Sequence, residues 1–135
     1  MKDPTRLYTA FSGIFLLLQG ISTLAFRLFP SLDEAFPALL AITQMVPPHS
    51  LLHILTGVTA LMVLLRGGSR GTFWFASLFG AFYFTLAIFG MVTGYATLLH
   101  LQPFDHPFHL ALGALGFLAA GVALYRSQKR KQASV

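Results

Sequence analysis

Four long apolar runs, separated by short stretches that hold most of the charged residues, constrain this chain more than any other feature of its sequence. The runs cover about residues 7–29, 49–65, 72–99 and 107–125. A helix needs about 20 apolar residues to cross the hydrocarbon core of a bilayer. The sequence therefore predicts an all-α, polytopic membrane protein, a four-transmembrane-helix bundle that forms a single membrane domain over residues 1–135.

The composition agrees with a membrane location. The chain is 56% hydrophobic and 10% charged, with a mean hydropathy of +0.72, whereas about a quarter of the residues of a soluble domain are charged. It has no cysteine, which excludes disulfides, thiolate metal sites and cysteine nucleophiles. The cationic residues flank the apolar runs and form no basic stripe on a polar domain, so we expect no nucleic-acid partner.

The cationic residues fall mainly on one side of the predicted spans. Eight of the nine Lys and Arg residues share that side: Lys2, Arg6, Arg66, Arg70, Arg126, Lys129, Arg130 and Lys131. An excess of Lys and Arg marks the cytoplasmic side, so we expect cytoplasmic N- and C-termini, with residues 126–135 as a basic cytoplasmic tail. All five histidines then lie toward the outer side. The segment 31–46 is short for a span and holds Asp33 and Glu34, which predicts an interfacial segment.

The second and fourth runs begin alike. Aligning His53 with His109 matches "HILTGVTAL" with "HLALGALGF", so both runs open with H-x-x-x-G. The first and third runs match more faintly, as "SGIF" against "FGAF" at residues 12–15 and 79–82. The bundle is therefore predicted to consist of two helical hairpins in a parallel repeat.

These motifs carry a resemblance to a known family. The stretches "GIFLLLQG", "HSLLHILTG", "FGAFYFTLAIFG" and "DHPFHLALG" resemble a bacterial four-span family catalogued as a domain of unknown function, number 4383. The resemblance implies a bacterial cytoplasmic (inner) membrane protein, and the family has no established activity. The positions that match its pattern are His53, Gly57, Asp105, His109 and Gly113. A second polar residue such as Asn is expected after Asp105, where this chain has His106 and Pro107.

The histidines are the residues best suited to chemistry. His49 and His53 are four residues apart and His106 and His109 three apart, so each pair shares one helix face. Two such pairs at one membrane depth can meet, and neutral imidazole binds zinc, copper, nickel and haem iron. In that hypothesis His53 and His109 are the ligands, and Asp105 orients a ligating imidazole.

A structural interpretation of the same residues stands beside the ligand hypothesis. His53 and His109 lie deeper and need a partner, which a hydrogen bond to each other or to a neighbouring helix also supplies. Asp105 and Ser50 stand where they can cap the starts of the fourth and second spans. The remaining histidines, His49, His100 and His106, are then wetted side chains near the interface.

Other marked positions indicate helix packing. Gln19, the strongly polar residue in the middle of the first span, is expected to form a hydrogen bond between helices. Gly57, Gly113, and the pair Gly90 and Gly94 are expected to allow close approach of helix backbones.

The sequence holds no nucleophile with a base and no paired carboxylates on one face, so we expect no enzyme. It favours a non-catalytic accessory or binding subunit. The alternative is a haem- or metal-binding redox protein that uses the outer-side histidines; the cofactor, haem or a divalent metal, is undecided. The lipid bilayer is the predicted partner, and a homo-oligomer or a larger membrane complex fits the same pattern.

The charge distribution makes a prediction about topology. A reporter fused after Val135 should lie in the cytoplasm, and a reporter inserted at Gln102 should lie on the outer side of the membrane, because Lys and Arg resist translocation. Measurement of both fusions in the same cells checks this. An external reporter at Val135 would overturn the assigned orientation.

Overall fold

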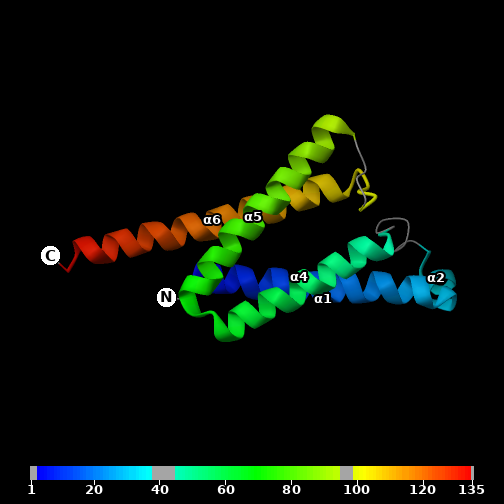
Figure 1. Cartoon of the computed structure of the whole chain (residues 1–135), viewed down its shortest axis with the longest axis horizontal. Coiled ribbons are helices and arrows are strands. Elements are labelled where there is room, and N and C mark those ends of the chain that lie inside the picture. Colours follow the sequence, from blue (N-terminus) through cyan, green and yellow to red (C-terminus); the bar gives the residue numbers. More distant parts are fainter. Residues whose placement is uncertain (1–2, 38–44, 95–98, 135) are drawn as a thin grey trace.

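The computed structural model describes residues 3–37, 45–94 and 99–134, and in these ranges the chain is all-α (Figure 1). The helices are α1 (Pro4–Leu28), α2 (Pro30–Ala35), α4 (Pro47–Arg66), α5 (Gly68–Thr93) and α6 (Asp105–Gln132). The α6 helix continues into the segment 126–135, so most of this predicted tail forms the last turns of a helix. The α2 helix covers the start of the predicted interfacial segment, of which residues 38–44 lie outside the described ranges.

Local sequence sets where the helices begin and end. The Asp3 side chain caps α1 by accepting a hydrogen bond of 3.0 Å from the backbone N–H of Thr5. Prolines open α1, α2 and α4, where their missing N–H leaves no donor unsatisfied. Gly94 ends α5 in the left-handed region, with φ of 62°, and no atom of the described chain lies where its side chain would be. Gly94 is thus a helix cap, and the prediction that it packs against another helix is wrong for this chain.

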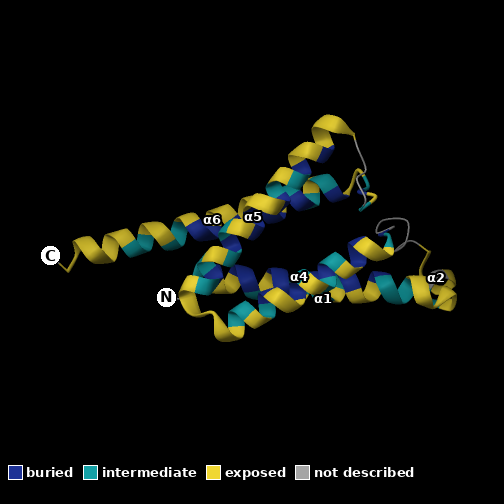
Figure 2. Ribbon diagram, in the orientation of Figure 1, coloured by how far each residue is buried: buried dark blue, intermediate teal, exposed yellow. Residues whose placement is uncertain are grey.

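Four of the helices, α1, α4, α5 and α6, are long and apolar enough to cross a membrane. Their outward faces are exposed and carry large apolar side chains, among them Leu18, Leu55, Leu78 and Leu118 (Figure 2). Contiguous apolar surface of this extent is suited to lipid chains and not to water. The chain is therefore an integral membrane protein with four candidate spans that contact the lipid bilayer.

The spans form two antiparallel hairpins, α1 with α4 and α5 with α6 (Figure 1). Both described chain ends and the connection at Gly67 lie at one end of the bundle, which also holds the basic residues of α6; we call it the basic end. The opposite end, called the distal end, is formed by the last turns of α1 and α5 and the first turns of α4 and α6. Every histidine that the structure describes belongs to the distal half.

Glycines let the helices of each hairpin approach closely. A methyl group on Gly57 of α4 would lie 2.7 Å from the backbone nitrogen of Leu17 in α1. A methyl group on Gly113 of α6 would lie 2.6 Å from the backbone nitrogen of Phe84 in α5. Both distances are shorter than van der Waals contact, so neither position has room for a side chain unless the helices separate.

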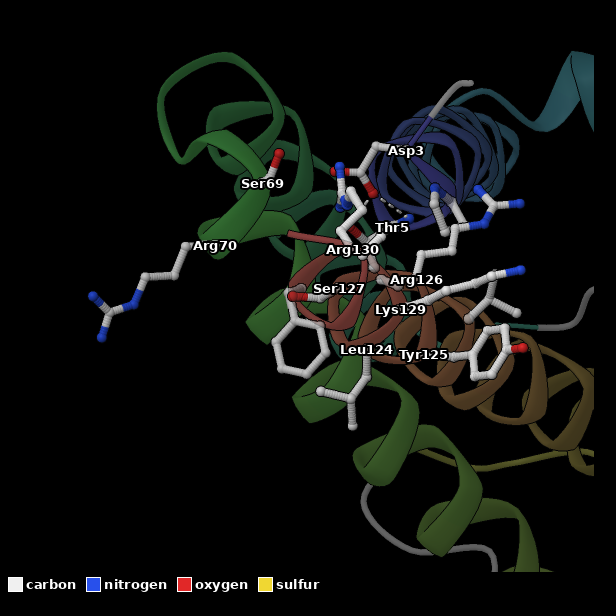
Figure 3. A pocket seen from close by; sticks show the side chains of 15 residues that line it. Asp3, Thr5, Ser69, Arg70, Leu124, Tyr125, Arg126, Ser127, Lys129 and Arg130 are labelled. Carbon is white, nitrogen blue, oxygen red and sulfur yellow. Dashed lines mark hydrogen bonds between the residues drawn. The ribbon is translucent and has the colours of Figure 1, made fainter. Parts of the chain in front are cut away.

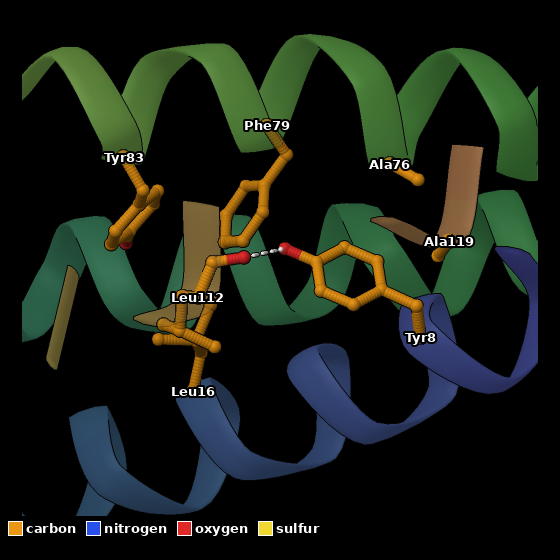
Figure 4. Close-up of a cluster of buried hydrophobic side chains, with 7 residues drawn as sticks. All are labelled: Tyr8, Leu16, Ala76, Phe79, Tyr83, Leu112 and Ala119. Carbon is orange, nitrogen blue, oxygen red and sulfur yellow. Dashed lines mark hydrogen bonds between the residues drawn. The ribbon is translucent and has the colours of Figure 1, made fainter. Parts of the chain in front are cut away.

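Aromatic and hydroxyl side chains join the two hairpins. Tyr8 of α1 donates a 2.8 Å hydrogen bond to the carbonyl oxygen of Leu112 in α6 and packs edge-on against Phe79 of α5 (Figure 4). Nearer the basic end, the hydroxyls of Thr5 and Thr72 share a buried hydrogen bond of 3.0 Å. These contacts fix how one hairpin lies against the other.

The glycine contacts predict a difference between positions. Alanine at Gly57 or Gly113 should lower the free energy of unfolding by about 1–3 kcal/mol, the usual cost of overpacking, since backbone atoms cannot move aside as a flexible side chain can. Gly121 has open space around it, so Gly121→Ala is the matched control. Thermal unfolding of the three detergent-purified variants measures the effect, and equal melting temperatures would refute the role of close approach.

Candidate metal centre

Three histidines meet at the distal end of the bundle. His49 and His53 extend from α4 and His109 from α6, and each is only 1% exposed. Their ring centroids are 4.6 Å apart for His49 and His53, 5.8 Å for His49 and His109, and 6.2 Å for His53 and His109. One nitrogen from each ring lies within 4.8 Å of the other two. We call these three residues the histidine cluster.

The cluster lies between α4 and α6. His49 and His53 are one turn apart on the same face of α4, as their spacing predicts. The α4 and α6 backbones make no direct contact in the described ranges, so the imidazoles extend across the space between two helices that do not otherwise pack together. The cluster is therefore a product of the way the hairpins dock.

The polar atoms of the cluster have no partners within the described chain. Both ring nitrogens of His49, His53 and His109 lack a hydrogen bond, as does the hydroxyl of Tyr83, whose ring lies 4.8 Å from that of His109. Buried polar groups in proteins are nearly always paired, and leaving one unpaired in an apolar medium is costly. Six unpaired nitrogens at one point therefore indicate a place for a bound group.

His49 contradicts the structural interpretation, in which it is a wetted interface residue. It is buried and completes the cluster, on the same face of α4 as His53, as the ligand hypothesis predicts. His106 instead turns toward α5. Its half-buried ring packs against Gly90, where a side chain at that position would lie. His100 is exposed, with φ of 46° in the turn before α6. The pair His49 and His53 thus contributes two candidate ligands, and the pair His106 and His109 contributes one, His109.

Asp105 and Ser50 do not cap their helices as predicted. Asp105 is the first residue of α6, and its Oδ2 accepts a 2.7 Å hydrogen bond from the backbone N–H of Gln102 in the preceding turn. Pro107 has no N–H to donate, so a capping carboxylate at Asp105 could accept a hydrogen bond only from the N–H of Phe108. Ser50 lies within α4, after the prolines that begin the helix, and its hydroxyl bonds that of Thr23 in α1 at 2.9 Å.

The Asp105 carboxylate is nevertheless part of the surroundings of the cluster. It is buried, with 7% of its surface exposed, and stands one helical turn before the buried His109 on α6, so that the two side chains share a helix face. It is not within the compact group that the three ligand nitrogens form. Asp105 therefore places a carboxylate on the same face of α6 as His109.

Two polar residues of the spans have different surroundings. Gln19 of α1 is half-buried, and its side-chain oxygen has no partner in the described chain, so the expected interhelical hydrogen bond of that oxygen is not formed there. Tyr83 of α5 lies beside the cluster, a position that the sequence motifs did not indicate. A tyrosine among phenylalanines was the available signal, because a buried phenol needs a partner where a phenyl ring does not.

A pocket at the basic end lies far along the bundle from the cluster. It is formed by the start of α1, the start of α5 and the last turns of α6, and its polar lining includes Asp3, Ser69, Arg70, Lys129 and Arg130 (Figure 3). Partial burial acts to raise the pKa of Asp3, but hydrogen bonds from Thr5 and Ser69 outweigh it and lower this pKa below its usual value. The pocket thus mixes both signs of charge and lacks the histidines that a transition metal prefers.

Three neutral imidazoles that converge from two helices fit the donor set of zinc, copper, nickel or iron. Both ring nitrogens of each cluster residue are without a competing hydrogen bond in the described chain, so they are open to coordination.

Comparisons of the chain with protein-family models, with curated proteins and with solved structures return no match, so the resemblance to the four-span family stays a prediction.

Proposed function

We propose that this chain is a non-catalytic membrane protein that binds a transition-metal ion at His49, His53 and His109. The observation that carries the proposal is the convergence of three buried imidazoles whose nitrogens lie within 4.8 Å of one another. A single ion bound to one nitrogen of each ring would satisfy three otherwise unpaired polar groups at once. The remaining nitrogens would then be N–H donors, which is the usual state of a metal-bound imidazole.

A purely structural role for the histidines is less well supported. It needs hydrogen bonds between His53, His109 or neighbouring helices, and none joins these rings to any residue of the described ranges. Three apolar side chains would fill the same space without leaving polar atoms unpaired. A bound ligand explains why imidazoles, and not apolar side chains, occupy these positions.

A single ion also suits the cluster better than haem does. A haem clamped between His53 and His109 needs a flat slot for its ring system. The ring of His49 lies 4.6 Å from His53 and 5.8 Å from His109 and so stands in that slot. The proposed cofactor is therefore a metal ion without a macrocycle.

The proposal includes a parallel repeat of the two hairpins. Counterparts in α1 and α5 lie 67 residues apart, as Ser12 and Phe79 do, and counterparts in α4 and α6 lie 56 apart, as His53 and His109 do. With these offsets Gly113 is the counterpart of Gly57, and Phe84 is the counterpart of Leu17. Gly57 is in close contact with Leu17, and Gly113 with Phe84. Equivalent positions thus make equivalent contacts in both hairpins.

Two pairs of counterparts also meet each other. Thr5 and Thr72 share a hydrogen bond, and His53 and His109 lie 6.2 Å apart in the cluster. Counterparts can be neighbours only near the axis that relates them, so these pairs support a two-fold axis along the bundle, as in a parallel repeat. We further propose, from the charge distribution, that the protein lies in a bacterial inner membrane with the basic end cytoplasmic.

Metal analysis tests the proposed function. Detergent-purified protein incubated with zinc or copper and then desalted should retain about one ion per chain, because the three imidazoles form one ligand set. His53→Ala and His109→Ala should each lose the ion, whereas His100→Ala, at an exposed position, should keep it. Elemental analysis gives the stoichiometry.

Stability supplies a second measurement of the same site. An ion that binds only the folded protein should stabilise it by about 2.7 kcal/mol at a free concentration 100 times its Kd. The melting temperature of the parent should therefore rise with added metal, and that of the His53→Ala, His109→Ala double variant should not. A parent that folds normally, retains no metal and shows no such rise would refute the proposal.

A further inference from the structure

We infer that the site is matched to a monovalent ion, copper(I), rather than to a divalent one, and that Asp105 is the carboxylate that balances its charge. This inference rests on the proposed function, because it names the ion that the histidine cluster takes. Two independent features carry it, the number of donors and the number of buried charges. A third, the position of Asp105 in the repeat, explains how the carboxylate reaches the site.

The donor set has three members. His49, His53 and His109 form the compact group, and no fourth histidine, cysteine or acidic side chain of the described residues joins it. Zinc in proteins is four-coordinate, and its three-ligand sites add a water or a substrate. Copper(I) is stable with three nitrogen donors in a plane and needs no additional ligand. Three imidazoles therefore meet the full requirement of copper(I), whereas zinc needs a fourth donor that no histidine or acidic side chain of the described residues adds to the cluster.

The charge count points the same way. Imidazoles bind as neutral ligands, so they leave the charge of the ion uncompensated. Among the acidic side chains whose burial the structure describes, Asp105 is buried, whereas Asp3 at the basic end is half-buried and Glu34 is exposed. Copper(I) and the Asp105 carboxylate sum to zero, whereas a divalent ion would leave one net positive charge in an apolar bundle. Burying net charge is costly, and a divalent ion also loses a stronger hydration shell.

The positive groups near the distal end do not change this count. Arg27 is exposed and donates from Nε to the carbonyl oxygen of Met45 at 3.2 Å, so its charge lies at the surface. His106 turns toward Gly90 of α5. In the described chain, the charge that lies close to the cluster and is shielded from solvent is that of Asp105.

Asp105 acts on the ion through its charge. The backbone N–H of Gln102 holds its Oδ2 at 2.7 Å, which fixes the carboxylate in the turn that leads into α6. In the proposed repeat Asp105 is the counterpart of His49, just as His109 is that of His53, so ligand and carboxylate lie at the same depth on opposite helices. No hydrogen bond joins this carboxylate to a cluster histidine in the described chain, so its proposed role is to balance the charge of the ion.

Tyr83 is the remaining group that could complete a divalent site. Its buried hydroxyl has no partner in the described ranges, and a phenolate oxygen is a harder donor than imidazole. The edge-on packing of its ring on His109, at 4.8 Å, is an aromatic contact that copper(I) binding does not require. Tyr83→Phe should therefore leave copper(I) affinity unchanged, and a large loss would overturn the three-donor site.

The test compares ions of different charge on the purified full chain. Under anaerobic conditions, competition with a chromogenic copper(I) chelator gives the copper(I) affinity, and silver(I) serves as a monovalent probe without redox chemistry. Zinc affinity is measured by competition with a zinc indicator. We expect copper(I) to bind more tightly than zinc, silver(I) to displace copper(I), and X-ray absorption of the copper(I) form to show three nitrogen neighbours.

Variants separate the role of the carboxylate from folding. Asp105→Asn keeps an oxygen that can accept from Gln102, so it should fold, yet it should weaken copper(I) binding about 10- to 100-fold, as loss of a carboxylate near a metal site does. Zinc binding should weaken further, because the interaction with a carboxylate scales with ionic charge. Glu34→Gln removes an exposed carboxylate and is the control, expected to match the parent. An unchanged affinity in folded Asp105→Asn would overturn the charge-balancing role.

The outcomes distinguish this inference from the function on which it rests. Zinc bound more tightly than copper(I), through the same three histidines, would overturn the monovalent site and leave the proposed metal binding intact. Retention of neither ion by the folded parent would overturn both.

Discussion

A bilayer offers no water to the backbone of a spanning segment, and this constraint shapes the whole protein. Every N–H and C=O group in the hydrocarbon region must be satisfied within the protein, which is why the four apolar runs are helices. The same medium removes the hydrophobic drive that would pack helices in water, so association depends on close contact and buried polar groups. Gly57 and Gly113 allow close contact within each hairpin, and the buried hydrogen bonds of Tyr8 and Thr5 join the two hairpins.

The histidine cluster gathers more unpaired polar atoms than any other place in the described chain. Hydroxyls nearby, such as those of Thr23 and Ser50, bond each other or a carbonyl group. The six ring nitrogens of the cluster have no such partner in the described chain. Unsatisfied buried groups mark functional sites because packing alone would replace them with apolar side chains. The proposed ion reconciles the cluster with the apolar surroundings, and Asp105 supplies the charge that three imidazoles lack.

The two-fold relation proposed for the hairpins explains where such a site can arise. Positions near the axis meet their own counterparts, so one residue type repeated in both hairpins gives two ligands that face each other, as His53 and His109 do. A difference between counterparts then makes the site asymmetric. His49 on one helix adds the third nitrogen, and Asp105 at the corresponding position of the other helix adds a negative charge.

The sequence alone predicted what depends on composition and on neighbours along the chain. Run length and charge placement predicted four helices, and the spacing of His49 and His53 predicted a shared face. Capping of α4 and α6 was predicted wrongly, because prolines at the starts of these helices change which N–H groups need a partner.

Only the tertiary structure decided which histidines meet. The sequence treated His49 and His106 alike, yet one joins the cluster and the other turns toward Gly90. That choice depends on how far α4 and α6 are held apart and how each is rotated about its axis. Both quantities are set by contacts between hairpins, at residues remote in sequence from the histidines, and no local pattern of residues encodes them.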